Sequence, residues 1–150
     1  MADTKKTHDT IHTLIECCRD SQQAYIEAAE HISDSRLRHF CNERALERSG
    51  FAGDLTERLR DFGEHHLKTE GSTGGAVRRA WMDVKTKLGG GDHAVLSSLE
   101  SCEDQIKHAY EEAMRGGLNH EFDSLIRTQA QSIYNAHDYI RGIRDRKNAA

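Results

Sequence analysis

Residues 11–32 read IHTLIECCRDSQQAYIEAAEHI, and apolar side chains recur in this stretch at spacings of four and three. Such spacing places them on one face of an α-helix. The stripe consists of Ile11, Ile15, Cys18, Gln22, Tyr25, Ala29 and Ile32. Only Gln22 in it is strongly polar, and an unpaired polar group in a packed seam costs about 1–3 kcal/mol. The stretch therefore predicts a packed helix whose central amide has a partner.

Two later segments repeat this pattern of an apolar stripe with a polar residue near its middle. The first is interrupted by a carboxylate and consists of Leu96, Leu99, Glu103, Ile106, Tyr110 and Ala113. The second is interrupted by an amide and consists of Phe122, Ile126, Gln129, Ile133, Ala136, Ile140 and Ile143. Three interruptions at matching heights predict a polar layer that several helices share.

Glycine clusters divide the chain, which contains no proline. Periodicity and cap-forming residues predict helices over 8–32, 35–62, 92–116 and 119–144, and strand patterns are absent, so the fold class is all-α. Two helical hairpins joined by a long connection predict a ferritin-like four-helix bundle, one domain over 1–150. The crossover, 64–92, contains a short extra helix over 75–88. In this topology the first and last helices are parallel to each other and antiparallel to the other two.

In this topology, the positions of residues along the bundle axis can be compared by counting from the turns, and this comparison gives the members of the polar layer. The seam expected for the second helix is Leu37, Phe40, Arg44, Glu47, Phe51, Leu55, Leu59 and Phe62. The layer then consists of Gln22, Arg44, Glu47, Glu103 and Gln129, with the hydroxyls of Tyr25 and Tyr110 nearby. Because a guanidinium is permanently charged and offers five donors, Arg44 is expected to reach Glu47 or Glu103 as an internal cation.

Most of the chain, from Ile11 to Arg144, resembles a known family. The resemblance is carried by ECCRDSQQAYIEAAEHISD, by AQSIYNAHDYIRGIRD, and by the segment GSTGGAVRRAWMDVKTKLGGGDHAVLSSLESCEDQIKHAYEEAM. Its most distinctive part is Trp81 followed by Leu99, Glu100, Glu103, Asp104, Tyr110, Glu111 and Ala113. These residues resemble an uncharacterised bacterial domain of unknown function that is grouped with ferritin-like four-helix bundles. The resemblance implies a fold and no particular activity.

Ferritin-like di-iron proteins use a glutamate from each of two helices and a Glu-x-x-His pair from each of the other two. Here Glu47 and Glu103 stand where glutamates are needed, with Gln129 on the fourth helix. The remaining ligands are missing, because the pattern is broken at Gln22, Gly50, Gln129, Ser132 and Tyr134. The expectation is therefore a non-enzymatic binding or stress-associated protein with a structural polar layer and no cofactor. The alternative is a divergent di-metal protein that handles iron or oxygen and holds iron, manganese or zinc at Glu47, Glu103 and Gln129.

The connector helix carries the clearest sign of a docking surface. Its apolar face consists of Val77, Trp81, Val84 and Leu88. A short helix is not stable alone, so this face is expected to pack on its own bundle, with a homodimer as the alternative.

Composition limits the other partners. A net charge of −4 over 150 residues gives no basic surface for nucleic acid, and no apolar run is long enough for a membrane. The expected location is the cytoplasm, and the four cysteines form neither a zinc motif nor a disulfide framework. The ten histidines are scattered, although Asp9 with His12 and Asp104 with His108 have spacings that can chelate an adventitious ion.

Overall fold

The computed structural model describes residues 4–63, 81 and 91–149, and these residues form four α-helices and no strand. The helices are α1 (Thr4–His31), α2 (Ser35–Asp61), α4 (Asp92–Arg115) and α5 (His120–Ala149). The all-α prediction is confirmed for this part of the chain. The first helix begins four residues earlier than predicted, and the last one continues five residues further.

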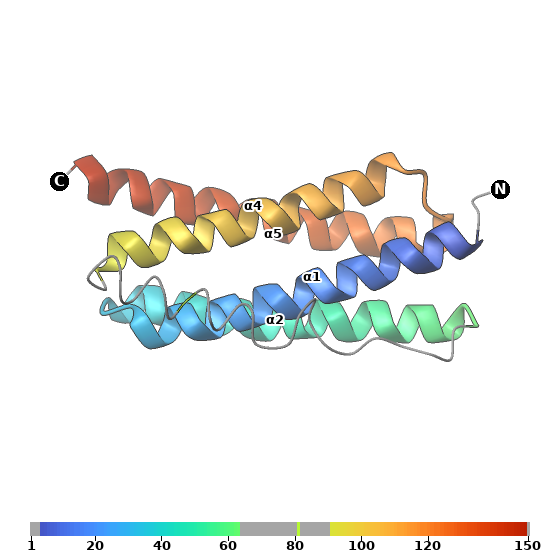
Figure 1. Ribbon diagram of the computed structural model, residues 1–150, viewed down its shortest axis with the longest axis horizontal. Helices are drawn as coiled ribbons and strands as arrows, with labels where there is room; N and C mark the ends of the chain where they lie inside the picture. Colours follow the sequence, from blue (N-terminus) through green and yellow to red (C-terminus); the bar gives the residue numbers. More distant parts are fainter. Residues whose placement is uncertain (1–3, 64–80, 82–90, 150) are drawn as a thin grey trace.

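The four helices form two antiparallel pairs that lie along a common long axis (Figure 1). Helices α1 and α2 pack together, α4 packs on α5, and α1 also packs on α4. Figure 1 shows that α1 and α5 run in one direction and α2 and α4 in the other, as predicted. The end of α2 and the start of α4 therefore lie at opposite ends of the bundle. The predicted helix over 75–88 falls outside the described residues, as do Val77, Val84 and Leu88.

Short polar contacts fix the turns. Asp34 caps α2, because its carboxylate accepts from the backbone N–H groups of Arg36 and Leu37 at 2.9 and 3.0 Å. Asp92 is the first residue of α4, and its carboxylate accepts from the backbone N–H of Ser33 at 2.9 Å. This contact joins the start of α4 to the α1–α2 turn. None of the described helices is long and apolar enough to cross a membrane.

The buried apolar side chains form two clusters along the bundle. The first cluster takes Ile11 to Cys18 from α1, Ala52 to Leu59 from α2, Ile106 to Ala113 from α4 and Phe122 to Ile133 from α5. The second takes Ala24 to Ile32, Leu37 to Ala45, Val95 to Leu99, Ile140 and Trp81. Between them, α1, α2 and α4 contribute the buried polar residues Ser21, Arg48 and Glu103. A polar layer thus separates the two halves of the core.

Candidate functional site

The centre of the polar layer is an ion pair between α2 and α4. Arg48 donates through Nη1 and Nη2 to the two carboxylate oxygens of Glu103, at 2.6 and 3.2 Å. Both side chains are 0% exposed. Arg48 Nη1 also donates to Ser21 Oγ at 2.9 Å, and its Nε donates to Glu47 at 3.4 Å. The pair is bidentate and all three nitrogens of the guanidinium are used.

Electrostatics keeps this arginine charged although it is buried. Burial is the largest single effect on Arg48 and would lower its pKa, but the charge and hydrogen bond of Glu103, together with Tyr25 and Glu47, raise this pKa above its usual value. The ring of Tyr25 lies beside the guanidinium, 5.3 Å from ring centroid to Cζ. Burial, reinforced by the charge of Glu103, raises the pKa of Tyr25 well above 10, so this phenol stays neutral. Its buried hydroxyl lies beside the Glu103 carboxylate.

A second hydrogen-bonded group lies next to this pair, in the first apolar cluster. Tyr110 Oη on α4 donates to Gln129 Oε1 on α5 at 2.6 Å and contacts Cys18 Sγ on α1 at 3.2 Å. Gln129 Nε2 donates to the carbonyl of Phe51 on α2 at 3.4 Å. Because the phenol proton points to Gln129, the Cys18 thiol is the donor in the sulfur contact. Side chains or backbone from all four helices meet in this group.

The structure brings two of the predicted layer residues into the buried centre, Glu103 and Gln129. Glu47 lies half-buried at the edge, between Arg44 and Arg48. Gln22 is also half-buried and accepts from Arg19 at 3.0 Å, while its neighbour Ser21 points into the layer.

The predicted internal cation was placed one turn too early. Arg44 does reach Glu47, at 3.3 Å, but its side chain is 25% exposed and it also pairs with Glu43. Arg48 is the guanidinium that binds Glu103. The error follows from the seam chosen for α2, which followed its large aromatic residues. The observed buried face consists of Leu37, Cys41, Ala45, Arg48, Ala52, Leu55 and Leu59.

Small residues were the signal that could have found Arg48. Cys41, Ala45 and Ala52 lie in helical register with Leu55 and Leu59, and the same stripe passes through position 48. Phe40, Phe51 and Phe62 lie on the flank and pack against the clusters while only partly buried. Small residues allow α2 to approach its neighbours closely, so size alone does not identify the core face.

The central residues do not fit a di-metal site. Such a site needs several carboxylates and imidazoles around two cations. Here the space between Glu47 and Glu103 is taken by a guanidinium that contacts both, and the described residues of this layer include no histidine with them. A divalent ion at this point would be repelled by the fixed charge of Arg48.

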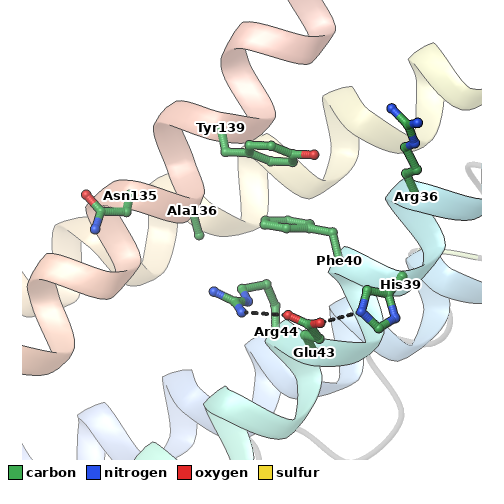
Figure 2. A pocket seen from close by; sticks show the side chains of 8 residues that line it. All are labelled: Arg36, His39, Phe40, Glu43, Arg44, Asn135, Ala136 and Tyr139. Atoms are coloured by element: carbon green, nitrogen blue, oxygen red, sulfur yellow. Dashed lines mark hydrogen bonds and ion pairs between the residues drawn. The ribbon is translucent and has the colours of Figure 1, made fainter.

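A surface cleft of about 370 Å³ lies between α2 and α5 (Figure 2). It is lined by Arg36, His39, Phe40, Glu43, Arg44, Asn135, Ala136 and Tyr139. The rings of Phe40 and Tyr139 stack across it, with centroids 4.4 Å apart. Glu43 contacts both His39 and Arg44 (Figure 2). The lining holds two arginines and one carboxylate, so the cleft offers an aromatic surface with a net positive charge.

Comparison with known proteins gives a family and no activity. A family model described as a domain of unknown function, DUF2383, matches residues 6–116. That range includes α1 except its first two residues, all of α2 and all of α4, and with them Ser21, Arg48 and Glu103. No match is found among curated proteins.

Proposed function

Since the chain belongs to the DUF2383 family, whose function is unknown, we propose from its geometry that it is a non-enzymatic bundle with ferritin-like connectivity. In this proposal the polar layer is structural, and the protein acts by binding at its surface. The support for the connectivity is the direction of the helices, because α2 ends and α4 begins at opposite ends of the bundle (Figure 1).

One observation carries the proposal: the guanidinium of Arg48 is fully buried between α2 and α4, in the bundle core, and the core is also where ferritin-like di-iron proteins bind their metal ions. Glu103 is fully buried and already has its counter-charge, at 2.6 Å from Arg48 Nη1. A carboxylate paired in this way is not available as a metal ligand or as a base. The pair also fixes the relative register of α2 and α4, which is the best-attested role of buried polar groups.

The cleft between α2 and α5 supports binding over chemistry. Tyr139 is 44% exposed and stacks on Phe40, and aromatic and arginine side chains are enriched where proteins bind other proteins. Leu46, which is 76% exposed, follows His39 and Glu43 at spacings of four and three and so lies on the same face of α2. The cleft and this leucine together form the surface that we expect a protein partner to cover.

Metal analysis of the untagged protein tests the structural reading of the layer. The protein is purified after growth with added iron and manganese, and its metal content is measured beside that of Glu103→Gln and Glu47→Gln. We expect neither iron nor manganese in stoichiometric amount in any of the three proteins. Stoichiometric iron or manganese that is lost in Glu103→Gln or Glu47→Gln would establish the di-metal alternative instead.

A further inference from the structure

A second cluster of ionisable side chains lies on the outer α4–α5 seam, away from the Arg48–Glu103 pair. Its members are Glu100 and Asp104 on α4 and His137 on α5, and one ligand atom from each lies within 4.8 Å of the others. His137 Nε2 is 2.6 Å from Asp104 Oδ1. We propose that these three residues form a binding site for one divalent transition-metal ion of the zinc type.

Helix geometry explains why the three side chains meet. Glu100 and Asp104 are four residues apart and therefore lie on one face of α4, one turn apart. Glu103 lies between them in sequence, but its side chain is fully buried and paired with Arg48. Helix α5 runs antiparallel to α4 (Figure 1). The 2.6 Å contact shows that His137 lies at the same position along the bundle as Asp104. The site is thus carried by two long helices and uses none of the residues of the central layer.

The burial of the three residues suits an ion that enters from one side. His137 is 4% exposed and Glu100 is 8% exposed, whereas the side chain of Asp104 is 61% exposed. Imidazole and carboxylate ligands bind zinc at about 2.0–2.2 Å, and zinc sites with three protein ligands keep a fourth position open. Asp104 would close over the ion from the solvent side, and water would fill the open position.

A neighbouring carboxylate supports the imidazole as a ligand. Asp138 Oδ1 lies 3.5 Å from His137 Nδ1, on the opposite side of the ring from Asp104. Metal-binding histidines commonly donate their second ring N–H to such a partner, which fixes the tautomer and leaves the other nitrogen free to bind. In the metal-free protein a ring proton lies between Nε2 and Asp104 in the 2.6 Å contact. A bound ion would take the place of that proton, and with Nδ1–H directed at Asp138 the lone pair of Nε2 would then face the ion.

Arg144 competes with a metal ion for this site. It forms an ion pair with Glu100 and also donates to Asp145 at 3.1 Å. Its side chain is 28% exposed, so it can keep Asp145 as a partner when Glu100 turns to the ion. Removal of this arginine should therefore strengthen metal binding, an effect that a purely structural ion-pair cluster would not show.

Zinc titration of the untagged protein tests the site. The protein is first treated with a chelator to remove bound metal, and zinc binding is then measured by calorimetry. We expect one equivalent of zinc to bind and to raise the melting temperature, because the ion joins α4 to α5. His137→Gln should weaken binding by more than about 100-fold, since loss of an outer-shell partner alone costs about 10–100-fold. Arg144→Gln should bind more tightly than the wild type.

The controls separate this site from adventitious binding. His108 on α4 lies 3.8 Å from Glu112 and is exposed, so His108→Gln should leave the titration unchanged. Asp104→Asn replaces an exposed side chain and should weaken binding without affecting the fold, which far-UV circular dichroism checks. Cobalt should give the d–d absorption of a low-coordinate site, and His137→Gln should abolish it.

Several results would overturn the inference. They are the absence of stoichiometric zinc binding, zinc binding that survives His137→Gln and Asp104→Asn, or an Arg144→Gln variant that binds no more tightly. None of these changes the proposed function, which concerns the central layer. Zinc that is lost in Glu103→Gln and retained in His137→Gln would contradict both.

Discussion

Tyr110 shows how much one hydroxyl contributes inside the bundle. It donates to Gln129 Oε1 at 2.6 Å and contacts Cys18 Sγ at 3.2 Å, all in the buried core. Tyr110→Phe keeps the ring but leaves a buried amide oxygen without a donor, which should cost about 1–3 kcal/mol of unfolding free energy. Urea denaturation measures this loss. Tyr139→Phe, at a ring 44% exposed, is the control and should change stability by less than about 0.5 kcal/mol. Equal effects of the two substitutions would contradict the role of Tyr110.

At the residue scale, the sequence identified some of the layer and missed its cation. Glu103 and Gln129 were found because each interrupts a strong apolar stripe. Arg48 was missed because the apolar residues around it on the buried face are alanine and cysteine, which do not stand out beside Phe40 and Phe51. The Asp104–His137 contact was missed as well, because it depends on the register between two helices.

At the element scale, the connector contributes a large anchor to the core. Trp81 is 2% exposed, belongs to the second apolar cluster, and lies 6.4 Å from the ring of His31 between centroids. It is the only tryptophan of the chain, so the emission spectrum reports this side chain alone. We expect blue-shifted emission that acrylamide quenches poorly, and a loss of about 3–5 kcal/mol in Trp81→Ala. A red-shifted, readily quenched emission from the native protein would contradict this packing.

Helices with strong stripes were predicted better than α2 was. The stripes of α1, α4 and α5 contain large aliphatic residues at regular spacing, so both their existence and their buried faces followed from the sequence. For α2 the residues at its two ends mark the helix, since Asp34 caps its start and Gly63, at positive φ, follows its C-cap Phe62, but they do not identify its buried face. The buried face of α2 is set by the neighbouring helices on which it packs, and the sequence of α2 alone does not identify it.

At the scale of the whole molecule, the direction of the helices could be predicted because connection lengths constrain it. Short turns at 32–34 and 116–119 force antiparallel pairs, and a long connection allows α4 to begin at the far end of the bundle. The docking role of Val77, Val84 and Leu88 stays a prediction, as does a homodimer through the connector.

Alkaline pH should destabilise the whole bundle. Burial raises the pKa of Cys18 and Cys41 to about 12, and it raises the pKa of Tyr25 and Tyr110 well above 10. In the unfolded chain these groups lose their protons near pH 9 and 10, so the folded state binds more protons above those values. Their contribution to stability is complete below about pH 9 and falls as the pH rises, by about 1.4 kcal/mol per pH unit for each such group.

Urea unfolding at pH 8 and pH 10.5 measures this slope. The urea concentration at the unfolding midpoint should be lower at pH 10.5 than at pH 8. This decrease should be smaller in Cys41→Ala than in the wild type, because the variant lacks one of the four groups. An unchanged midpoint would show that the four groups titrate alike in both states.

The central claim is that Arg48 and Glu103 form one buried structural unit, and a double-mutant cycle measures it most directly. Arg48→Met leaves a buried carboxylate unpaired and should cost about 3–5 kcal/mol of unfolding free energy, whereas Arg48→Met with Glu103→Leu should cost much less than the two single changes together. Arg44→Met, one turn away in a partly exposed pair, is the matched control and should cost less than about 1 kcal/mol. Additive single effects, or an Arg44→Met cost equal to that of Arg48→Met, would contradict the claim.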